Sequence, residues 1–166
     1  STQSAKGIKY LENRGSAQCK SSIMLAALNA SGTTSIKAKK SRNHSELLFK
    51  YLKIPIKVRK TKKFDFIDIK KPKKINAFNY QIPGDISSSA FFMVLTTLAN
   101  NSKLLIKNVN INPSRVGVIT ILKKMGAQIT FKNQKNYRGE KISDILIKSS
   151  KKLKAINCPT KLNSSA

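Results

Sequence analysis

The sequence contains no tryptophan, one histidine and two cysteines in 166 residues. Cys19 and Cys158 lie far apart, and neither has a second cysteine or a histidine at a metal-ligand spacing. This pattern argues against a structural zinc site and a disulfide framework, so we expect both thiols to be reduced and no metal or other cofactor to be bound. The single histidine, His44, would have to carry any Ser-His-Asp or Cys-His apparatus alone, and we interpret it as structural.

Acidic residues are also scarce, with 7 Asp and Glu against 33 Lys and Arg and a formal net charge of +26. Such a surplus attracts polyanions, which makes nucleic-acid binding an alternative from a different functional class. Only five of the basic residues are arginines, although specific nucleic-acid readout and bidentate phosphate contacts favour arginine. We therefore interpret the dispersed lysines mainly as solvated surface and predict no specific nucleic-acid partner.

Long apolar runs are missing as well. The stretches 23–28 and 91–95 have the length of core segments and are far shorter than the roughly 18 apolar residues that a membrane helix needs. The polar start, 1–6, does not resemble a signal peptide. These features favour a cytoplasmic protein without a membrane partner.

The most informative stretch begins at Gly15 and Ser16 and leads into the apolar segment 23–28. A glycine followed by a serine N-cap predicts a helix over 16–29, apolar almost all round and therefore buried. The free backbone N–H groups of its first turn would hold a phosphate or carboxylate beside Ser16 and Gln18. A capped core helix that binds nothing is the alternative.

The rest of the chain predicts an α/β protein with an internal repeat. A shift of 70 residues places Gly32 on Ser102, Ile36 on Ile106 and Leu48 on Val118. Each half has the order helix, strand, helix, strand, strand. The helices are expected over 16–29, 43–53, 87–99 and 112–125, and the strands over 7–11, 33–39, 55–60, 63–70, 103–109, 127–132 and 143–148.

Six short segments resemble, in order, motifs of the EPSP synthase family, the 3-phosphoshikimate 1-carboxyvinyltransferases. Each motif is weak alone, but together they extend over nearly the whole chain. The segments are Ser16-Ala17-Gln18-x-Lys20-Ser21, Ser41-Arg42-Asn43-His44-Ser45-Glu46, Pro83-Gly84-Asp85-Ile86-Ser87-Ser88-Ser89-Ala90, Asn112-Pro113-Ser114-Arg115-x-Gly117, Lys124-Met125-Gly126-Ala127 and Gly139-Glu140-x-x-x-Asp144.

The resemblance implies a fold class: α/β, built from repeated helix-strand-helix-strand-strand units. In that family three units form each of two domains, with buried parallel helices inside and sheets outside. Residues 1–82 would be the last unit of one domain and 83–166 the first unit of the other. Each unit would lack its two neighbours, so we expect apolar helix positions such as Met24, Leu28, Phe91 and Leu95 to be uncovered.

The resemblance also implies an activity and its anionic partners. The family transfers the enolpyruvyl group of phosphoenolpyruvate to the 5-hydroxyl of shikimate 3-phosphate. Ser16, Ala17 and Gln18 match the segment that holds shikimate 3-phosphate, with Gln18 also reaching phosphoenolpyruvate, and Arg42 matches an arginine that contacts the shikimate phosphate. Asn43 departs from the aspartate that usually follows this arginine. Asp85 is expected to cap a helix.

Several family motifs have no counterpart in the chain. These are an amino-terminal lysine and arginine motif, a Gly-Asn-Ala-Gly-Thr loop, a catalytic aspartate and carboxy-terminal basic residues, so no catalytic residue is predicted within 1–166. We interpret the sequence as an internal fragment, inactive alone, of an enzyme that is a monomer at full length. The related UDP-N-acetylglucosamine enolpyruvyl transferase and a basic RNA-binding protein remain as alternatives.

Overall fold

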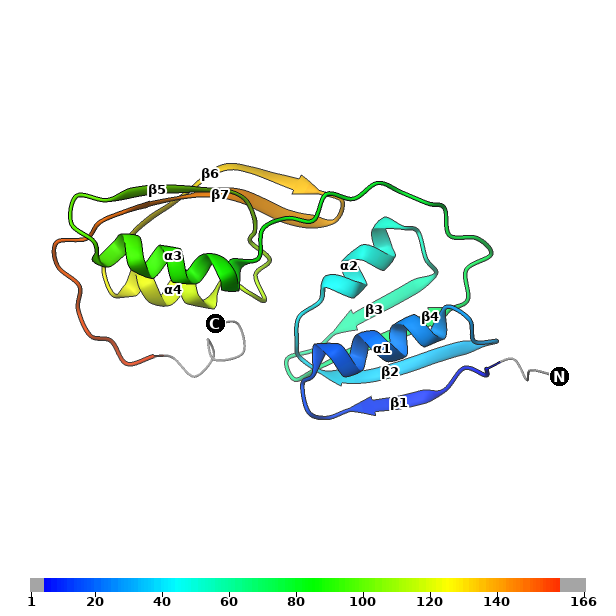
Figure 1. Cartoon of the computed structure of the whole chain (residues 1–166). Helices are drawn as coiled ribbons and strands as arrows, with labels where there is room; N and C mark the ends of the chain where they lie inside the picture. Colours follow the sequence, from blue (N-terminus) through cyan, green and yellow to red (C-terminus); the bar gives the residue numbers. More distant parts are fainter. Residues whose placement is uncertain (1–4, 159–166) are drawn as a thin grey trace. The chain divides into compact units, whose positions relative to one another are not determined.

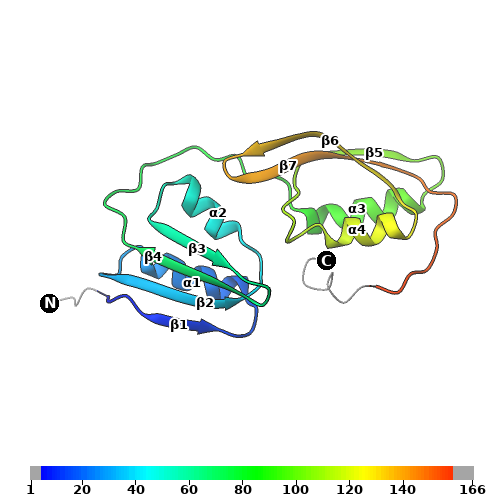
Figure 2. The same cartoon turned by 180° about the vertical axis from the view of Figure 1, so that it is seen from behind.

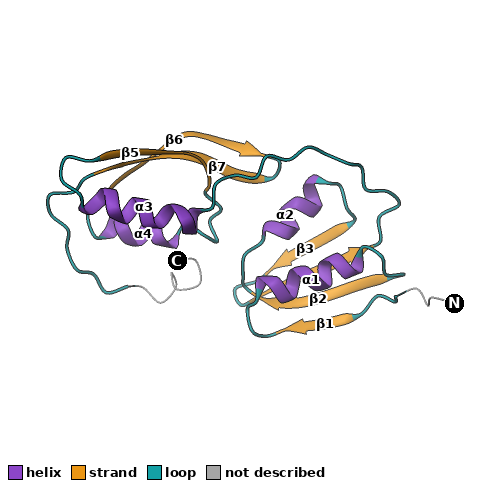
Figure 3. Cartoon of the chain, viewed as in Figure 1, coloured by secondary structure: helices purple, strands orange, loops and turns teal. Residues whose placement is uncertain are grey.

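The computed structural model describes residues 5–158 (Figure 1). The chain divides into two compact units, Ser1–Asn79 and Tyr80–Ala166. The point of division lies in the connection 71–85, which contains no helix or strand. Each unit consists of two helices packed on a β-sheet, so the chain is an α/β protein (Figure 3).

The sheet of the first unit has the strand order β1-β2-β4-β3. β1 runs parallel to β2, and the other neighbouring strands are antiparallel. Seen from behind, this sheet lies in front of α1 (Figure 2). The elements are β1 (Lys9–Glu12), α1 (Ala17–Ala27), β2 (Thr33–Lys39), α2 (His44–Tyr51), β3 (Ile56–Lys60) and β4 (Phe64–Lys70).

Alternation along the strands builds the first core. In β4, Ile67 and Ile69 are buried against the helices, while Phe66 and Asp68 face the other side of the sheet. Ile36 lies opposite Ile67 in the antiparallel ladder and is also buried. The whole cluster is Met24, Ala27, Ile36, Ala38, Phe49, Ile54, Ile67 and Ile69.

The second unit has a three-stranded antiparallel sheet of order β5-β7-β6. Its elements are α3 (Ile86–Leu98), β5 (Lys103–Asn110), α4 (Gly117–Lys124), β6 (Gln128–Tyr137) and β7 (Glu140–Lys148). Its core contains Met93 from α3, Ile119 and Leu122 from α4, and Ile145 and Ile147 from the central strand.

The predicted repeat is confirmed in element order and in strand order. β2-β4-β3 of the first unit corresponds to β5-β7-β6 of the second. The first unit has one additional strand, β1, beside β2. In the second unit a single parallel bridge between Gly84 and Val109 stands at the equivalent edge.

Within its own unit the first helix is not covered on every side, although it was expected to be buried all round. Only one stripe of α1 is buried, formed by Lys20, Met24 and Ala27, whereas Leu25 is exposed. The i, i+4, i+7 spacing of the stripe shows that one face alone contacts the sheet. Met24 is therefore covered within its own unit, contrary to expectation, and Leu28 is half-buried.

The helix α3 follows the expectation of uncovered apolar positions. Phe91 and Leu95 have exposed fractions of 78% and 64%. Phe92, Val94 and Leu98 are exposed as well. A continuous apolar surface of this kind is typical of a helix face that another element covers.

Two boundaries differ from the sequence prediction. The helix expected from Asn112 begins at Gly117, because the Asn112 side chain accepts a hydrogen bond from the backbone N–H of Ser114 and stabilises a turn instead. The segment 133–142, expected to connect the last two strands, is mostly strand. β6 and β7 are joined by Arg138 and Gly139, both with positive φ, which is the conformation of a two-residue hairpin turn.

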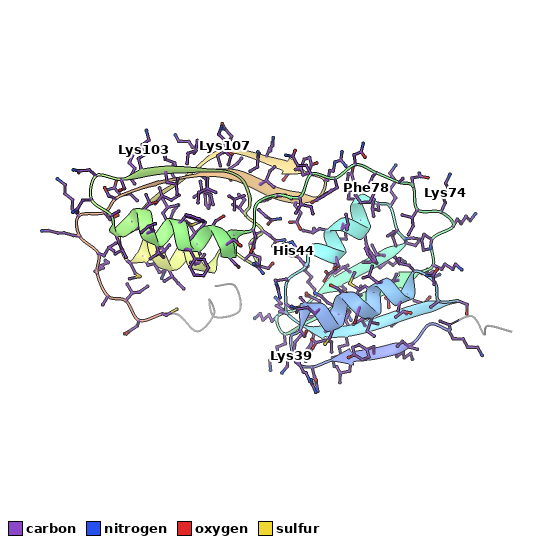
Figure 4. All side chains as sticks on the ribbon, viewed as in Figure 1. Lys39, His44, Lys74, Phe78, Lys103 and Lys107 are labelled. Carbon is purple, nitrogen blue, oxygen red and sulfur yellow. The ribbon has the colours of Figure 1, made fainter. Side chains whose placement is uncertain are left out.

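Basic side chains occur on the surface of both units. Lys39 and Lys74 belong to the first unit and Lys103 and Lys107 to the second, and all four point away from the ribbon in Figure 4. Over residues 5–158 no helix has the length and apolar character needed to cross a membrane.

Candidate functional site

A buried carboxylate shapes the turn in front of α1. Glu12, at the end of β1, accepts hydrogen bonds from the backbone N–H groups of Arg14 at 2.9 Å, Gly15 at 2.9 Å and Ser16 at 3.1 Å. Gly15 has φ +77°, a left-handed conformation that glycine adopts without steric cost. Glu12 was not among the predicted site residues. An acidic residue four positions before an N-cap, in a chain so poor in acids, is the signal that could have identified it.

Ser16 is the N-cap of α1, as predicted. Its hydroxyl accepts a hydrogen bond from the Cys19 N–H at 3.2 Å. Ala17 and Gln18 form the start of the helix, where backbone N–H groups have no carbonyl partner within the helix. The positive end of the helix dipole lies here, so this terminus attracts an anion.

A cavity of about 220 Å³ opens at this terminus. Arg42 lines it from the segment between β2 and α2, and His44 lines it from the first residue of α2. Figure 4 labels His44. The structure thus brings together three of the four predicted binding residues, Ala17, Gln18 and Arg42. Ser16 caps the helix beside them but does not line the cavity. The full lining is Ala17, Gln18, Ser21, Arg42, His44 and Ser45.

The cavity lining combines the permanently charged side chain of Arg42 with hydrogen-bonding side chains, among them Gln18 and Ser45. Within residues 5–158, no carboxylate forms an ion pair with the Arg42 guanidinium. A guanidinium, a helix N-terminus and the Gln18 amide together suit a phosphate, since the planar fork of arginine binds two phosphate oxygens at once. The arrangement can bind and orient an anion.

The helix α2 does not begin as predicted. It was expected from residue 43 but begins at His44, and the side chain of Asn43 at the cap position makes no capping hydrogen bond. The Ser41 hydroxyl is buried and has no hydrogen-bond partner among the described residues. The first turn of α2 therefore depends on other contacts, and the most direct comes from Lys20 of α1, 2.7 Å from the Glu46 carboxylate.

The second unit contains a counterpart of this arrangement with a different outcome. Asp85 is the N-cap of α3, as predicted, and Arg115 stands two residues before α4 just as Arg42 stands two residues before α2. Here the Arg115 guanidinium lies 2.9 Å from the Asp85 carboxylate and also donates to the Ser87 hydroxyl. The anion at this helix terminus is thus supplied by the chain itself.

Other motif residues of the second unit hold its strands and turns together. Glu140 accepts a hydrogen bond from the Asn112 side chain at 3.1 Å. Asp144, on the central strand, accepts from the Asn108 N–H and from the Asn133 amide, both at 2.8 Å. Asn108 and Asn133 have positive φ and lie where the registers of β5 and β6 shift. Asp144 therefore fixes a bulge in each neighbouring strand.

These contacts lower the pKa of two carboxyl groups. Burial raises the pKa of Asp85, but hydrogen bonds from the Ser87 and Ser88 N–H groups and the Arg115 charge outweigh it, so the pKa lies below the ordinary 3.8. For Asp144 the largest cause is the hydrogen bond from the Asn108 N–H, followed by the Asn133 amide, and the pKa again lies below 3.8.

We expect acid to destabilise the second unit through these two groups. A carboxyl whose pKa is lower in the folded than in the unfolded chain stabilises the fold above the unfolded pKa, and this stabilisation is lost as the pH falls through the folded value. Urea midpoints should therefore be flat from about pH 5 to 7 and fall below about pH 4. Asp144→Asn should reduce that acid dependence, and an unchanged pH profile in this variant would contradict the assignment.

Over residues 5–158 the structure contains no group of three or more His, Cys, Asp or Glu side chains that could hold a metal ion. Cys19 and Cys158 are both exposed, and neither forms a disulfide within residues 5–158.

Known proteins resemble this chain over nearly its whole length. Residues 1–163 match the family model described as EPSP synthase (3-phosphoshikimate 1-carboxyvinyltransferase). The 3-phosphoshikimate 1-carboxyvinyltransferase of Thermoanaerobacter sp. (strain X514) is 44% identical over 147 residues, which cover 88% of this chain and 34% of the relative. That of Hydrogenovibrio crunogenus is 43% identical over 159 residues, covering 95% and 36%.

Solved structures give the same result. The EPSP synthase from Acinetobacter baumannii superposes with a TM-score of 0.81 at 40% sequence identity, covering 95% of this chain and 35% of that one. The chain thus spans about a third of the length of the curated relatives that it matches.

Proposed function

Because the chain belongs to the EPSP synthase family, we propose that it forms part of a 3-phosphoshikimate 1-carboxyvinyltransferase. The complete enzyme would transfer the enolpyruvyl group of phosphoenolpyruvate to the 5-hydroxyl of shikimate 3-phosphate and release phosphate. The observation that carries this proposal is the cavity at the N-terminus of α1, where Gln18 and Arg42 meet.

The proposed roles follow from the chemistry of each group. Arg42 would bind the phosphate of shikimate 3-phosphate through two charge-assisted hydrogen bonds. The first-turn N–H groups at Ala17 and Gln18 would add donors, with Ser16 fixing the start of the helix. The Gln18 amide would extend from this substrate toward phosphoenolpyruvate.

We assign the two halves to two different domains of the complete enzyme. Residues 1–82 would form the last unit of one domain and residues 83–166 the first unit of the other. The repeated strand order supports this assignment, and so does the division of the chain into two compact units. The exposed apolar side chains of α3, among them Phe91 and Leu95, would then face a neighbouring unit of the same domain.

Binding groups alone do not transfer an enolpyruvyl group, because proton transfer needs an acid and a base within hydrogen-bond reach of the reacting atoms. We assign no catalytic residue within the chain. The activity therefore requires the groups that the other two thirds of the relatives provide. We further propose a cytoplasmic location and a monomeric full-length enzyme, from the family resemblance.

Phosphate release tests the proposal. A full-length enzyme, built around residues 1–163 with the remaining two thirds supplied by a relative, should release phosphate from phosphoenolpyruvate only when shikimate 3-phosphate is present. Residues 1–166 alone should stay at the no-enzyme control, because the opposing substrate contacts are missing. Turnover with UDP-N-acetylglucosamine in place of shikimate 3-phosphate would instead support the related enolpyruvyl transferase.

One observation favours the RNA-binding alternative. The outer face of the first sheet carries Phe66 with the Arg59 guanidinium 4.1 Å from its ring, and Phe64 with the Lys37 ammonium at 4.8 Å. Aromatic rings beside cations on a sheet are a feature of RNA-binding domains. In this chain, however, the cations cover the rings, and Asp68 lies on the same face.

We therefore expect only weak, non-specific binding of nucleic acid. In fluorescence anisotropy at about 150 mM salt, single-stranded RNA should bind no more tightly than the roughly 10⁻⁴ to 10⁻⁶ M typical of non-specific contacts, without sequence preference. Affinity should fall steeply as salt rises. Nanomolar binding of one sequence, lost in Phe66→Ala, would replace the proposed function by RNA recognition.

A further inference from the structure

Lys20 is a completely buried lysine directly behind the candidate site. Its side chain has an exposed fraction of 0%, and that of Glu46 has 5%. The Lys20 ammonium lies 2.7 Å from a Glu46 carboxylate oxygen and donates a hydrogen bond to the Arg42 carbonyl at 2.8 Å. One charged group thus joins the helix α1 to the segment before α2 and to the first turn of α2.

Stability alone does not account for this ion pair. Removing two charges from water costs free energy that their attraction only partly repays, so well-packed apolar side chains of similar size stabilise a fold as well or better. The second carboxylate oxygen of Glu46 is also buried without a hydrogen-bond partner among the described residues. A buried acceptor without a partner is a further cost.

The positions of the contacts suggest a reason for the buried ion pair between Lys20 and Glu46. Lys20 and Ser21 contact the segment 42–46 at three points: the Arg42 carbonyl, the Glu46 carboxylate and the Ser45 hydroxyl, which lies 2.6 Å from that of Ser21. These contacts fix the backbone from which the Arg42 side chain enters the cavity. They leave the guanidinium itself without an ion-pair partner in residues 5–158.

The second unit shows the alternative way to hold such an arginine. Ser89, four residues after the N-cap of α3 as Lys20 is four after that of α1, only returns a hydrogen bond to the Asp85 carbonyl at 2.8 Å. Arg115 is held through its guanidinium by Asp85. An arginine fixed in that way is already neutralised, whereas one fixed through its backbone keeps its charge for a ligand.

We propose that Lys20 is a positioning residue for phosphate binding. It neutralises Glu46 and holds the Arg42 carbonyl, so that the Arg42 guanidinium is directed into the cavity and stays unpaired until the substrate arrives. The inference rests on the proposed function, because it takes the phosphate of shikimate 3-phosphate as the ligand of Arg42.

The test compares two ligands that differ only by the phosphate, in the full-length enzyme built around this segment. For Lys20→Met, the Kd of shikimate 3-phosphate should rise roughly tenfold, by analogy with metal sites, where loss of a group that orients a ligand costs about 10- to 100-fold. The Kd of shikimate should change less than about twofold, because shikimate offers Arg42 no phosphate. A general loosening of the site would weaken both ligands equally and would overturn the inference.

A double variant separates positioning from folding. Lys20→Met with Glu46→Leu replaces the ion pair by apolar side chains and should melt at or above the wild-type temperature. It should still bind shikimate 3-phosphate weakly, since the Arg42 carbonyl has lost its donor. Wild-type affinity in this variant would overturn the inference.

Arg42→Ala, measured in parallel, separates failure of the inference from failure of the proposed function. If Arg42→Ala weakens binding and Lys20→Met does not, Lys20 has no positioning role and the phosphate site stands. If neither substitution weakens binding, the phosphate site is wrong and the positioning role is overturned with it.

Discussion

Replacing Arg42 by alanine in the full-length enzyme should weaken shikimate 3-phosphate binding roughly ten- to a hundredfold. Hydrogen bonds to a charged group contribute about 1.5 to 3 kcal/mol, and about 1.4 kcal/mol corresponds to a factor of ten. The cavity provides no replacement, because its other side chains, such as Gln18 and His44, lack a permanently charged fork. Isothermal titration with shikimate 3-phosphate measures the change directly.

Arg115 supplies a matched control. It stands at the same position relative to its helix, but its guanidinium is paired with Asp85. Arg115→Ala should therefore leave the Kd of shikimate 3-phosphate within about twofold, even if it lowers the melting temperature. Equal dissociation constants for wild type and Arg42→Ala would contradict the role of Arg42 in phosphate binding. A large rise of the Kd in Arg115→Ala would show that binding responds to general disturbance of the fold and not to the Arg42 side chain in particular.

Local patterns made much of this arrangement predictable. Ser16 and Asp85 are short polar residues directly before apolar runs, and such residues satisfy the first N–H groups of a helix whatever surrounds it. The alternation of apolar and polar residues along the strands can also be read from short stretches of sequence. The order of the elements in both units was therefore predictable. The resemblance to the family then indicated Gln18 and Arg42 as binding residues, a prediction that stands until it is measured.

Contacts between distant segments were not predictable in this way. Lys20 and Arg115 had no assigned role, because their partners Glu46 and Asp85 lie 26 and 30 residues away, and nothing local distinguishes them from surface lysines and arginines. In the structure each joins two of the motifs that carry the family resemblance. A chain with 33 basic and 7 acidic residues makes such pairs easy to overlook, although the few acids are the informative residues.

The extent to which the helices are buried was the feature hardest to predict from the sequence. The apolar run 23–28 looks buried on every side, yet only the stripe that contacts the sheet is covered in its unit. The apolar run 91–95 on α3 likewise leaves Phe91 and Leu95 exposed. A sequence specifies apolar positions but not how many layers will cover them, because that depends on neighbouring units of the complete domain.

Because α1 has one buried face and one exposed face, the largest effect on stability is expected from a substitution on its buried face. Met24 is completely buried in the first core, between α1 and the sheet that carries Ile36 and Ile67. Met24→Ala would leave a cavity there, and such truncations cost about 2 to 5 kcal/mol, a large part of the stability of a small domain. We expect the urea midpoint of the first unit to fall markedly, as followed by circular dichroism of residues 1–166.

The neighbouring residue provides the comparison. Leu25 lies on the same helix with a similar volume, but 57% of its surface is exposed. Leu25→Ala should change the free energy of unfolding by about 0.5 kcal/mol or less in residues 1–166, since exposed substitutions rarely exceed that. In the full-length enzyme, where we propose that a neighbouring unit covers this face, the same substitution should become costly. Equal effects of Leu25→Ala in both proteins would contradict the proposed three-unit domain, because no partner would then pack on the outer face of α1.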